Sequence, residues 1–314
     1  WKNIKHWTQA DIVPAGSVLG IQEAAMALAA GVVNYALVMR TGHHPQGVRY
    51  RQRSGNTAGG NEAFSAIYGH GIGGSGQAVT YSEYLKKYNG TREELATYVL
   101  TAHKNAQDNP YSVWRGRQLT LEDYLNARII AWPMCIFDND MPVDGIVAFV
   151  LTTEDRAKDT PHPGGYIAGM ASTPLHSYPP AVASSLSSQE EVQAQQGRNL
   201  YASAGMGPED IDLIHVYDGF APMVPMWLEA FQFAPRGEGL RWMQGGTIER
   251  DGPHPLNTSG GNLGEGRIHG GAHVYETAVQ MMGTAGSHQL EGMEVALCET
   301  GPFTHGSSII VTRD

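Results

Sequence analysis

The sequence IDLIHVYDGFAPMVPMWLEAFQF (residues 211–233), followed after a polar loop by LNTSGGNLGEGR (residues 256–267), decides the fold of this chain. An apolar strand ends at Tyr217 and Asp218, and a helix rich in large apolar residues begins beside it. The later glycine-rich loop opens a second helix. In α/β proteins, ligands bind where strands end and helices begin, because backbone N–H groups and helix dipoles converge there. Two such junctions in one half of the chain predict a functional site between them.

The composition indicates a globular protein with a sizeable core. The 314 residues are 41% apolar, which suits one large domain or two smaller units. The formal charge of −10 argues against a nucleic-acid-binding surface, because such a surface needs a basic face. No run approaches the roughly 20 apolar residues of a membrane-spanning helix. Cys135 and Cys298 lie in apolar, strand-like segments, so we expect no disulfide and a cytoplasmic location.

The first half of the chain, residues 1–160, has a helix–strand pattern that a loop region interrupts at 41–120. Within that region, Thr91 and Glu94 have the spacing of a helix N-cap and its capping-box partner. The strands lack polar alternation, which is typical of sheets covered on both faces. The expected elements are a buried helix at 16–31, a strand at 33–42, irregular chain at 41–80, two helices within 81–109 and a strand at 146–153.

The second half, residues 161–314, begins with a proline-, serine- and histidine-rich segment that reads as a linker or surface loop. Strands and helices then alternate as in the first half. The expected elements are strands at 165–172, 212–219, 294–300 and 307–313, and helices at 193–205, 223–233 and 270–286. The order predicts an α/β fold of two similar halves, each with a helix that begins at a glycine-rich junction.

Several segments, in their order and spacing, resemble the thiolase superfamily, and within it the non-specific lipid-transfer-protein branch that includes steroid side-chain aldolases. The match runs from about residue 14 to the end and is weakest over 41–80. The resemblance implies a five-layered αβαβα fold, usually dimeric, of which the N-terminal strand–helix portion is expected to be missing here. The segments are AGSVLGIQEAAMALAAG (15–31), HKNAQDNPYS (103–112), LTLEDYLNARIIAWPMCIFDNDMPVDGIVAFVL (119–151), GMGPEDIDLIHVYDGFAP (205–222), LNTSGGNLGEG (256–266), HGGAHVYETAVQMMGTAG (269–286) and EVALCETG (294–301).

The chain departs from thiolases at the positions that carry their chemistry. The nucleophilic cysteine of that family, activated at the start of a buried helix, falls at Pro14 or Ala15. The second thiolase cysteine aligns near Cys298. Arg267 stands where thiolases have a histidine and where aldolase-like relatives are expected to have a tyrosine. We therefore expect no acyl-enzyme chemistry.

Retro-aldol cleavage needs a base for the hydroxyl proton and a group that stabilises the enolate. The resemblance makes Tyr217 the candidate base, provided that a neighbouring cation favours its ionised form. Arg267 and the backbone N–H groups of Ser259 to Gly261 are candidates for the oxyanion. Asp218 is expected to orient a partner or cap the next helix, and His305 is a second candidate acid or base. The alternative for Tyr217 is a tyrosine whose hydroxyl caps a loop.

His269 is the remaining candidate catalytic residue, in the loop that precedes a helix. With His273 and Glu276 it forms a His-x3-His-x2-Glu pattern that could hold a metal on one helical face. No Cys or Asp completes a ligand set, so we expect no metal ion.

Substrate contacts are expected from three groups of residues. The one basic cluster of this acidic chain suits the phosphates of CoA, although a solvated loop is the alternative. Backbone of the NTSGG segment suits close approach to a ligand, and the apolar helix at 223–233 is mostly core but could line an acyl pocket. The candidates are Arg49 and Arg51 in the cluster Arg40, His43, His44, Arg49, Arg51 and Arg53; Asn257, Ser259, Gly260 and Gly261; and Met223, Met226 and Trp227.

Three functions remain open from the sequence. The first is a lyase that cleaves a β-hydroxyacyl-CoA, for example one derived from a steroid side chain, to a ketone or aldehyde and a short acyl-CoA. The resemblance then implies no cofactor beyond the CoA thioester, a homodimer, and a DUF35 partner with an OB fold and a zinc ribbon. The second is a non-catalytic subunit that binds acyl-CoA or lipid. The third, a Claisen-type acyltransferase, lacks its cysteine.

Overall fold

The computed structural model describes residues 4–10, 15–43, 74–160, 164–173, 185–303 and 305–313. Its main sheet is mixed and has the strand order β5-β8-β7-β6, with β6 and β7 parallel and the other pairs antiparallel. A separate antiparallel pair joins β1 and β4. The strands are β1 (Tyr35–Gly42), β4 (Gly145–Thr152), β5 (Tyr166–Ser172), β6 (Leu213–His215), β7 (Val295–Thr300) and β8 (Ser307–Thr312).

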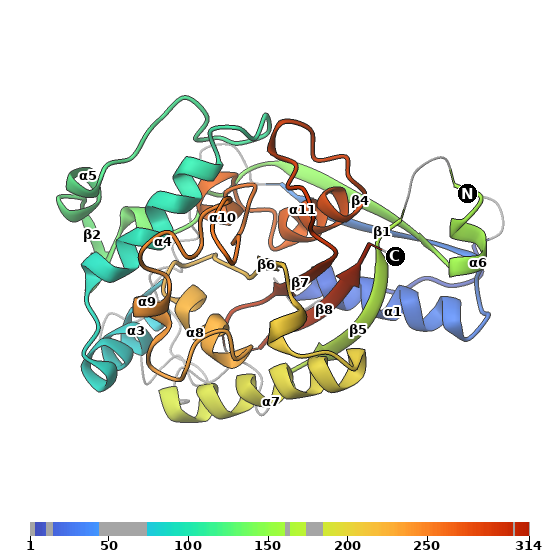
Figure 1. Cartoon of the computed structure of the whole chain (residues 1–314), viewed down its shortest axis with the longest axis horizontal. Coiled ribbons are helices and arrows are strands. Elements are labelled where there is room, and N and C mark those ends of the chain that lie inside the picture. The colour runs from blue at the N-terminus through green and yellow to red at the C-terminus, as the bar shows by residue number, and fades with distance from the viewer. Residues whose placement is uncertain are drawn as a thin grey trace, which may run out of the picture.

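Helices separate the two sheets and cover the larger one. Helices α1 (Gly16–Ala29) and α11 (Gly271–Met281) contact both the β1–β4 pair and the main sheet, so they form a layer between them. Helix α7 (Leu186–Ala204), along the lower edge in Figure 1, packs on β5 and on α8 (Met223–Ala230). The described residues therefore stack in the order sheet, helices, sheet, helices. This is the expected thiolase-like α/β arrangement, with four of the five predicted layers within the described part of the chain.

The β1–β4 pair corrects the expectation that both of these strands are covered on two faces. Exposure alternates along each strand, and Ile146 and Val150 of β4 have exposed fractions of 63% and 73%. The reason is that α1 and α11 pack against only one face. No element among the described ranges covers the other face.

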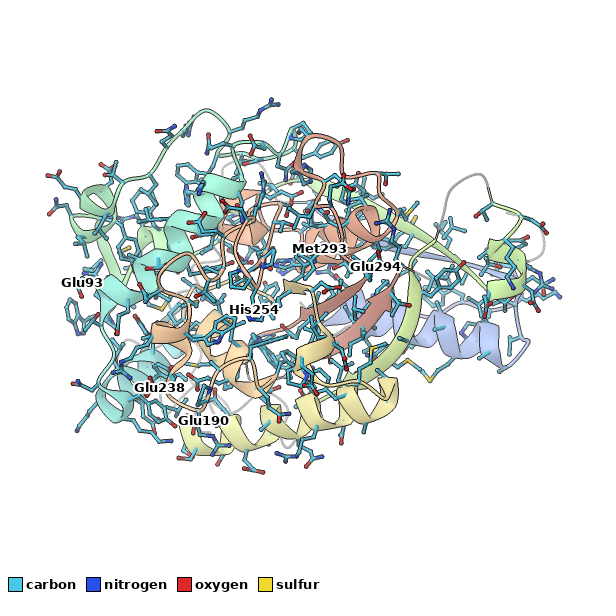
Figure 2. All side chains as sticks on the ribbon, in the orientation of Figure 1. Glu93, Glu190, Glu238, His254, Met293 and Glu294 are labelled. Atoms are coloured by element: carbon cyan, nitrogen blue, oxygen red, sulfur yellow. The ribbon has the colours of Figure 1, made fainter. Side chains whose placement is uncertain are left out.

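The loop region contains more regular structure than predicted. Helix α3 (Ser75–Tyr88) begins six residues before the expected start at Tyr81, and α4 (Arg92–Asn105) has the predicted capping box between Thr91 and Glu94. Glu190 of α7 accepts hydrogen bonds from Lys87 and Tyr88, which fastens α3 to the main body (Figure 2). The remaining pieces of this region are α5 (Leu121–Leu125), β2 (Ile129–Ala131), β3 (Met134–Cys135) and the 3-10 turn η1 (Ile136–Asp138).

Short helices complete the chain, and none of the described helices is long and apolar enough to span a bilayer. Cys135 and Cys298 are both free thiols in the core. The short elements are α6 (Glu154–Ala157), η2 (Pro208–Asp210), α9 (Gly239–Trp242), α10 (Gly261–Gly264) and η3 (Gly286–His288).

Candidate active site

The ends of β6 and β7 and the starts of α1 and α11 meet at one junction between the two sheets (Figure 1). Ser17 Oγ, in the first turn of α1, donates to the His269 carbonyl just before α11, at 2.8 Å. The backbone N–H of Val18 donates to Thr300 Oγ1, at the end of β7, over 3.3 Å. The predicted convergence of strand ends and helix starts is therefore present, and it brings both halves of the chain together.

Asp218 is the centre of this junction. It is fully buried, and its Oδ2 accepts the Tyr98 hydroxyl at 2.6 Å. Its Oδ1 accepts the Asn262 N–H at 2.7 Å and lies 3.0 Å from His273 Nε2. The Leu263 N–H adds a longer bond of 3.3 Å to Oδ2. Asp218 thus caps α10 and links it to α4 and α11, while its role in catalysis stays a prediction.

The glycine-rich loop owes its path to Asn257 and to Asp218. Asn257 accepts the Val216 N–H and donates to the Val216 carbonyl, at 3.0 and 2.9 Å. These bonds replace those of a neighbouring strand, so β6 ends at His215, whereas the predicted strand ran from 212 to 219. Gly261 has φ +60° and a side chain there would collide with the Asp218 carboxylate, so close packing and backbone conformation both require glycine.

The amides of this loop are mostly engaged inside the protein. The Gly260 N–H donates to the Asn257 carbonyl at 2.8 Å, and the Asn262 and Leu263 amides donate to Asp218. In this conformation the Gly260 amide is therefore not free to donate to an oxyanion. Asn262 follows directly, and both polar atoms of its buried amide lack a hydrogen-bond partner within the part of the chain that the structure describes.

Tyr217 lies against α11 and against a buried carboxyl group. Its exposed fraction is 4%, its ring centroid is 6.0 Å from that of His273, and its N–H donates to Glu299 Oε2 at 3.1 Å. Burial raises the pKa of Glu299 well above its ordinary value, although the bond from Tyr217 opposes this. Burial thus favours the neutral form of Glu299, whose carboxyl group supports the backbone of the candidate base.

Arg267 joins the glycine-rich loop to the first half. Its Nη1 lies 3.5 Å from Asp140 Oδ1, and its N–H donates to the Met141 carbonyl at 2.8 Å. The Asp140 side chain is 2% exposed. Because this carboxylate already neutralises Arg267, the guanidinium is a weaker oxyanion partner than the sequence suggested.

The two candidate histidines lie in different loops, His269 before α11 and His305 between β7 and β8. His269 precedes α11 with φ +48°, so the predicted His-x3-His-x2-Glu face does not exist, and Glu276 is bonded instead to Thr258, Gln280 and His288. Within the described residues, no three His, Cys, Asp or Glu side chains are arranged to hold a metal ion. His305 is buried in the loop between β7 and β8.

The thiol-based alternative finds no support in the geometry. Ala15 precedes α1, where a thiolase places its nucleophile, and it is buried. Burial raises the pKa of the Cys298 thiol to about 12. Neither position therefore offers a thiolate at neutral pH.

Other candidates are core residues or lie outside the described residues; Trp227 reaches the end of β7 only through its Nε1–H, which donates to the Gly301 carbonyl at 3.3 Å. Trp227 is fully buried in the core, where its ring packs on Phe231 and Phe303. Met223 is also a core residue, at 1% exposed. Arg49 and Arg51, proposed for CoA phosphates, lie outside the described residues.

Four residues of the site were not assigned to it from sequence. Tyr98 gave no signal, since it occupies an ordinary helical position. Burial raises the pKa of Glu265 to about 7. This residue lies in the glycine-rich segment, where no sequence pattern distinguishes it. Two others had a visible signal: Arg40 and Glu299 are the single charged residues in otherwise uncharged strands.

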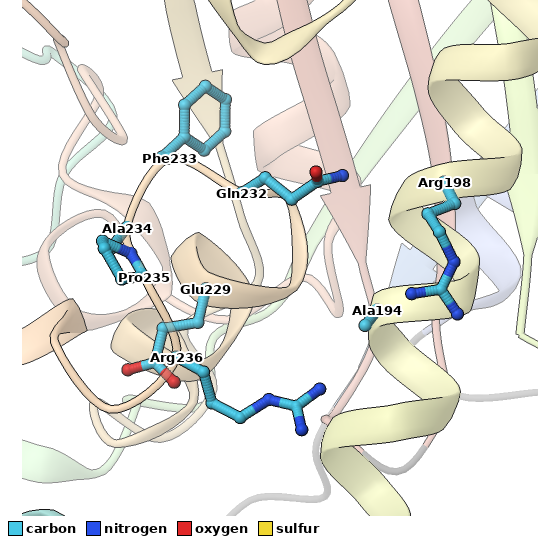
Figure 3. A pocket seen from close by; sticks show the side chains of 8 residues that line it. All are labelled: Ala194, Arg198, Glu229, Gln232, Phe233, Ala234, Pro235 and Arg236. Atoms are coloured by element: carbon cyan, nitrogen blue, oxygen red, sulfur yellow. The ribbon is translucent and has the colours of Figure 1, made fainter.

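Two surface pockets occur elsewhere. One of about 550 Å³ lies between α7 and the loop after α8, where Figure 3 shows Arg198 and Arg236 among its lining residues. Another of about 480 Å³ lies beside α3 and the start of α4, with Trp132 at its edge. Neither of these two pockets includes a residue bonded to Asp218, so convergent side chains, not pocket shape, define the candidate site.

Comparisons with known proteins point to one family. A family profile described as "Thiolase C-terminal domain-like" matches residues 181–313. The "Steroid side-chain-cleaving aldolase" of Thermomonospora curvata is 32% identical, over 84% of this chain and 70% of the relative. The "17-hydroxy-3-oxo-4-pregnene-20-carboxyl-CoA lyase" of Mycobacterium tuberculosis is 30% identical, over 93% of this chain and 77% of the relative.

A solved structure agrees with these relatives. The "Ltp2-ChsH2(DUF35) aldolase" superimposes with a TM-score of 0.85 at 29% identity, over 96% of this chain and 78% of that one. The predicted resemblance is therefore confirmed by sequence and by fold.

Proposed function

Since the chain belongs to the thiolase superfamily, in the lipid-transfer-protein-like branch that includes steroid side-chain-cleaving aldolases, we propose that it is a carbon–carbon lyase that cleaves a β-hydroxyacyl-CoA by a retro-aldol reaction. The products are a ketone or aldehyde and a shorter acyl-CoA. The names of the two relatives favour a steroid side-chain thioester as the substrate. CoA is part of that substrate, and the proposal includes no other cofactor.

The observation that carries the proposal is the placement of Tyr217 beside Asp218 at the junction of both halves. Tyr217 takes the proton of the β-hydroxyl, the carbon–carbon bond breaks, and its electron pair forms the thioester enolate. Protonation of the enolate carbon then releases the acyl-CoA. Asp218 is the positioning residue, because its bonds to Tyr98 and His273 fix the elements on both sides of Tyr217. His269 and His305 remain candidates for the acid that protonates the enolate.

A lyase of this kind needs no covalent intermediate, and this agrees with the missing nucleophile. The position of the reactive cysteine falls at Pro14 or Ala15, neither of which is a nucleophile, and burial favours the neutral thiol of Cys298. The proposal therefore prefers the lyase over a Claisen-type acyltransferase.

A second function, a non-catalytic acyl-CoA-binding subunit, is favoured by one observation. Arg267 is paired with Asp140, which removes the strongest cationic candidate for the enolate oxygen. In the lyase, donors that remain are the Ser259 and Gly261 amides or the unpaired amide of Asn262.

Partners are proposed from the solved relative. Its title names a DUF35 component, so we propose a DUF35-type subunit for this chain, in an assembly built on a homodimer. Any zinc ion belongs to that subunit in this proposal. The two free, buried cysteines agree with the cytoplasmic location expected from the sequence.

The test is a carbonyl-release assay on the chain co-expressed with a DUF35-type subunit. Secondary and tertiary β-hydroxyacyl-CoA esters, steroid side-chain esters among them, are incubated with the complex, and ketone and shortened CoA ester are measured by mass spectrometry. Tyr217→Phe should lower kcat by about 100-fold or more, since it removes the base.

The matched control is Tyr201→Phe, which removes another buried hydroxyl, the one that donates to Phe231 O at 2.7 Å. This variant should keep its activity. Tight ester binding without cleavage, unchanged in Tyr217→Phe, would instead establish the binding subunit.

A further inference from the structure

Arg40 occupies an unusual place for a charged side chain. In β1 it lies on the half-buried face that it shares with Ala36 and Val38, while Leu37 and Met39 lie on the exposed face. Val38 packs into the smaller hydrophobic cluster between the sheets. A cation on this inward face costs desolvation energy unless it has a charged partner.

No carboxylate pairs with Arg40 in the part of the chain that the structure describes. No ion pair joins Arg40 to an Asp or Glu among the residues that the structure describes, and its buried Nε has no hydrogen-bond acceptor there. Burial lowers the pKa of Arg40, and the nearby hydroxyl of Tyr217, when ionised, opposes that effect. The desolvation of Arg40 is therefore offset when Tyr217 carries a negative charge.

The first turn of α11 brings the two residues together. A β-carbon built on Gly271 would be 3.4 Å from Arg40 Cγ, so the Arg40 stem packs on the start of this helix. His273, in the same turn, has its ring centroid 6.0 Å from that of Tyr217. Arg40 and Tyr217 thus reach the same helix start from different sheets.

We propose that Arg40 is the cation that stabilises the ionised hydroxyl of Tyr217, so that Tyr217 can take the proton of the substrate's β-hydroxyl. This inference rests on the proposed function, in which Tyr217 is the base. The proton moves from the substrate oxygen to the Tyr217 oxygen, and Arg40 keeps its own proton throughout. Arg40 is therefore a positioning residue that acts through Tyr217, and it needs no additional reactant.

This role replaces the one that the sequence suggested for Arg40, as part of a phosphate-binding cluster. His43, from the same cluster, is exposed and lies 3.4 Å from Asp144 at the outside of the molecule. Arg40 instead lies on the inward face, toward the junction, which suits a bound phenolate better than a solvated phosphate.

The experiment compares Arg40→Gln and Arg40→Lys with the wild type in the complex with the DUF35-type subunit. The first readout is the pH profile of kcat/KM for the β-hydroxyacyl-CoA. Without the cation, the phenolate forms only at higher pH, so Arg40→Gln should lose on the order of tenfold in kcat/KM near neutral pH and recover as the pH rises. Arg40→Lys keeps a charge and should lie between the two.

The second readout does not need turnover. The ultraviolet absorbance of tyrosinate is followed against pH in the wild type, in Tyr217→Phe and in Arg40→Gln, and the Tyr217 signal is taken by difference. In Arg40→Gln this signal should appear at higher pH. Arg198→Gln is the control, because Arg198 is an exposed cation on α7 that pairs with Glu191, and both of its readouts should match the wild type.

Several outcomes would overturn the inference. Unchanged pH profile and absorbance in a folded Arg40→Gln would remove Arg40 from the mechanism. A raised KM for the CoA ester, without any effect on the matching pantetheine thioester, would return Arg40 to phosphate binding. If Arg40→Gln does not fold, a folded Arg40→Lys whose loss of kcat/KM is the same at every pH would also contradict it. A shifted tyrosinate signal in a complex that cleaves no ester would support the pairing but overturn the lyase.

Discussion

The end of β6 and the start of α1 face the same junction but are built in opposite ways. Beyond β6, Asp218 is fully buried and accepts bonds from Tyr98, Asn262 and Leu263. At α1, the N-cap Ala15 offers no side-chain bond at all. In the proposed mechanism, therefore, the chemistry lies at a strand end and not at a helix start, while the surrounding layers stay the same.

The two sides also differ in how they treat an ionisable group. Buried carboxylates are tolerated only with several donors, which Asp218 has. Cys298, in the neighbouring strand β7, belongs to the hydrophobic cluster between the sheets and touches the Thr277 hydroxyl, and burial raises its pKa to about 12. Hydrogen-bond donors therefore stabilise the charged Asp218 carboxylate beyond β6, whereas burial disfavours the thiolate form of Cys298.

The largest expected effect comes from removing the Asp218 carboxylate, which accepts the hydrogen bonds at the end of β6. Asp218→Asn places an amide N–H₂ against groups that donate hydrogen bonds. We expect a loss of about 3 kcal/mol in the free energy of unfolding, because buried donors lose a charged acceptor, and a loss of lyase activity at least as large as in Tyr217→Phe. Urea unfolding and the carbonyl-release assay measure the two effects.

Asp212 offers a matched control at the opposite end of the same strand. Its Oδ2 accepts the N–H groups of Glu294 and Val295, at 2.9 and 3.0 Å, but it lies outside the junction. Asp212→Asn should cost about 1 kcal/mol and leave the cleavage rate unchanged. Equal losses of activity in both variants would mean that the rate follows stability and not the junction.

The secondary-structure elements on which this comparison rests could be predicted from the sequence, because they depend on local residue patterns. The capping box at Thr91, the apolar strands and the YDGF junction all follow from neighbouring residues, and the fold class is confirmed. The domain boundary at 160 stays a prediction. The polar contacts could not be predicted, since Tyr98 and Asp218 are 120 positions apart and a helical tyrosine has no distinctive spacing.

Arg40 shows a different limit of sequence reasoning. In the sequence analysis, its charge grouped Arg40 with the nearby arginines. In the structure, the two-residue period of strand β1 puts Arg40 on the inward face. The single charged residue in β1 was the available signal, and its importance becomes clear only when α11 brings Tyr217 close.

Glu265, in the glycine-rich loop, allows the β6 side of the comparison to be tested through the pH dependence of stability. Burial raises the pKa of Glu265 from 4.5 to about 7, so the folded state binds this proton more tightly than the unfolded state. The stability it contributes is fully present below pH 4.5 and is lost as the pH rises to about 7. At about 1.4 kcal/mol for each pH unit, the loss amounts to about 3 kcal/mol at most.

Glu265→Gln should therefore flatten the curve of unfolding free energy against pH within this window. Urea unfolding at a series of pH values measures it, with Glu291→Gln, an exposed surface change, as the control that keeps the wild-type curve. Parallel curves for wild type and Glu265→Gln would show that the carboxyl is solvated and that the β6 side is less closed than described.

The smallest effect is expected on the thiol side, at Cys298→Ala. The side chain is fully buried, so its removal should cost about 1 kcal/mol of stability. The cleavage rate should stay within about twofold, because a thiol with a pKa near 12 is protonated at neutral pH and supplies no nucleophile. Mass spectrometry of the wild type after incubation with acyl-CoA should show no added acyl group.

Cys135→Ala, which removes the other buried thiol, is the matched control for stability. An acyl adduct on Cys298, or a rate loss found in Cys298→Ala but not in Cys135→Ala, would mean that the Cys298 thiol in β7 takes part in the chemistry.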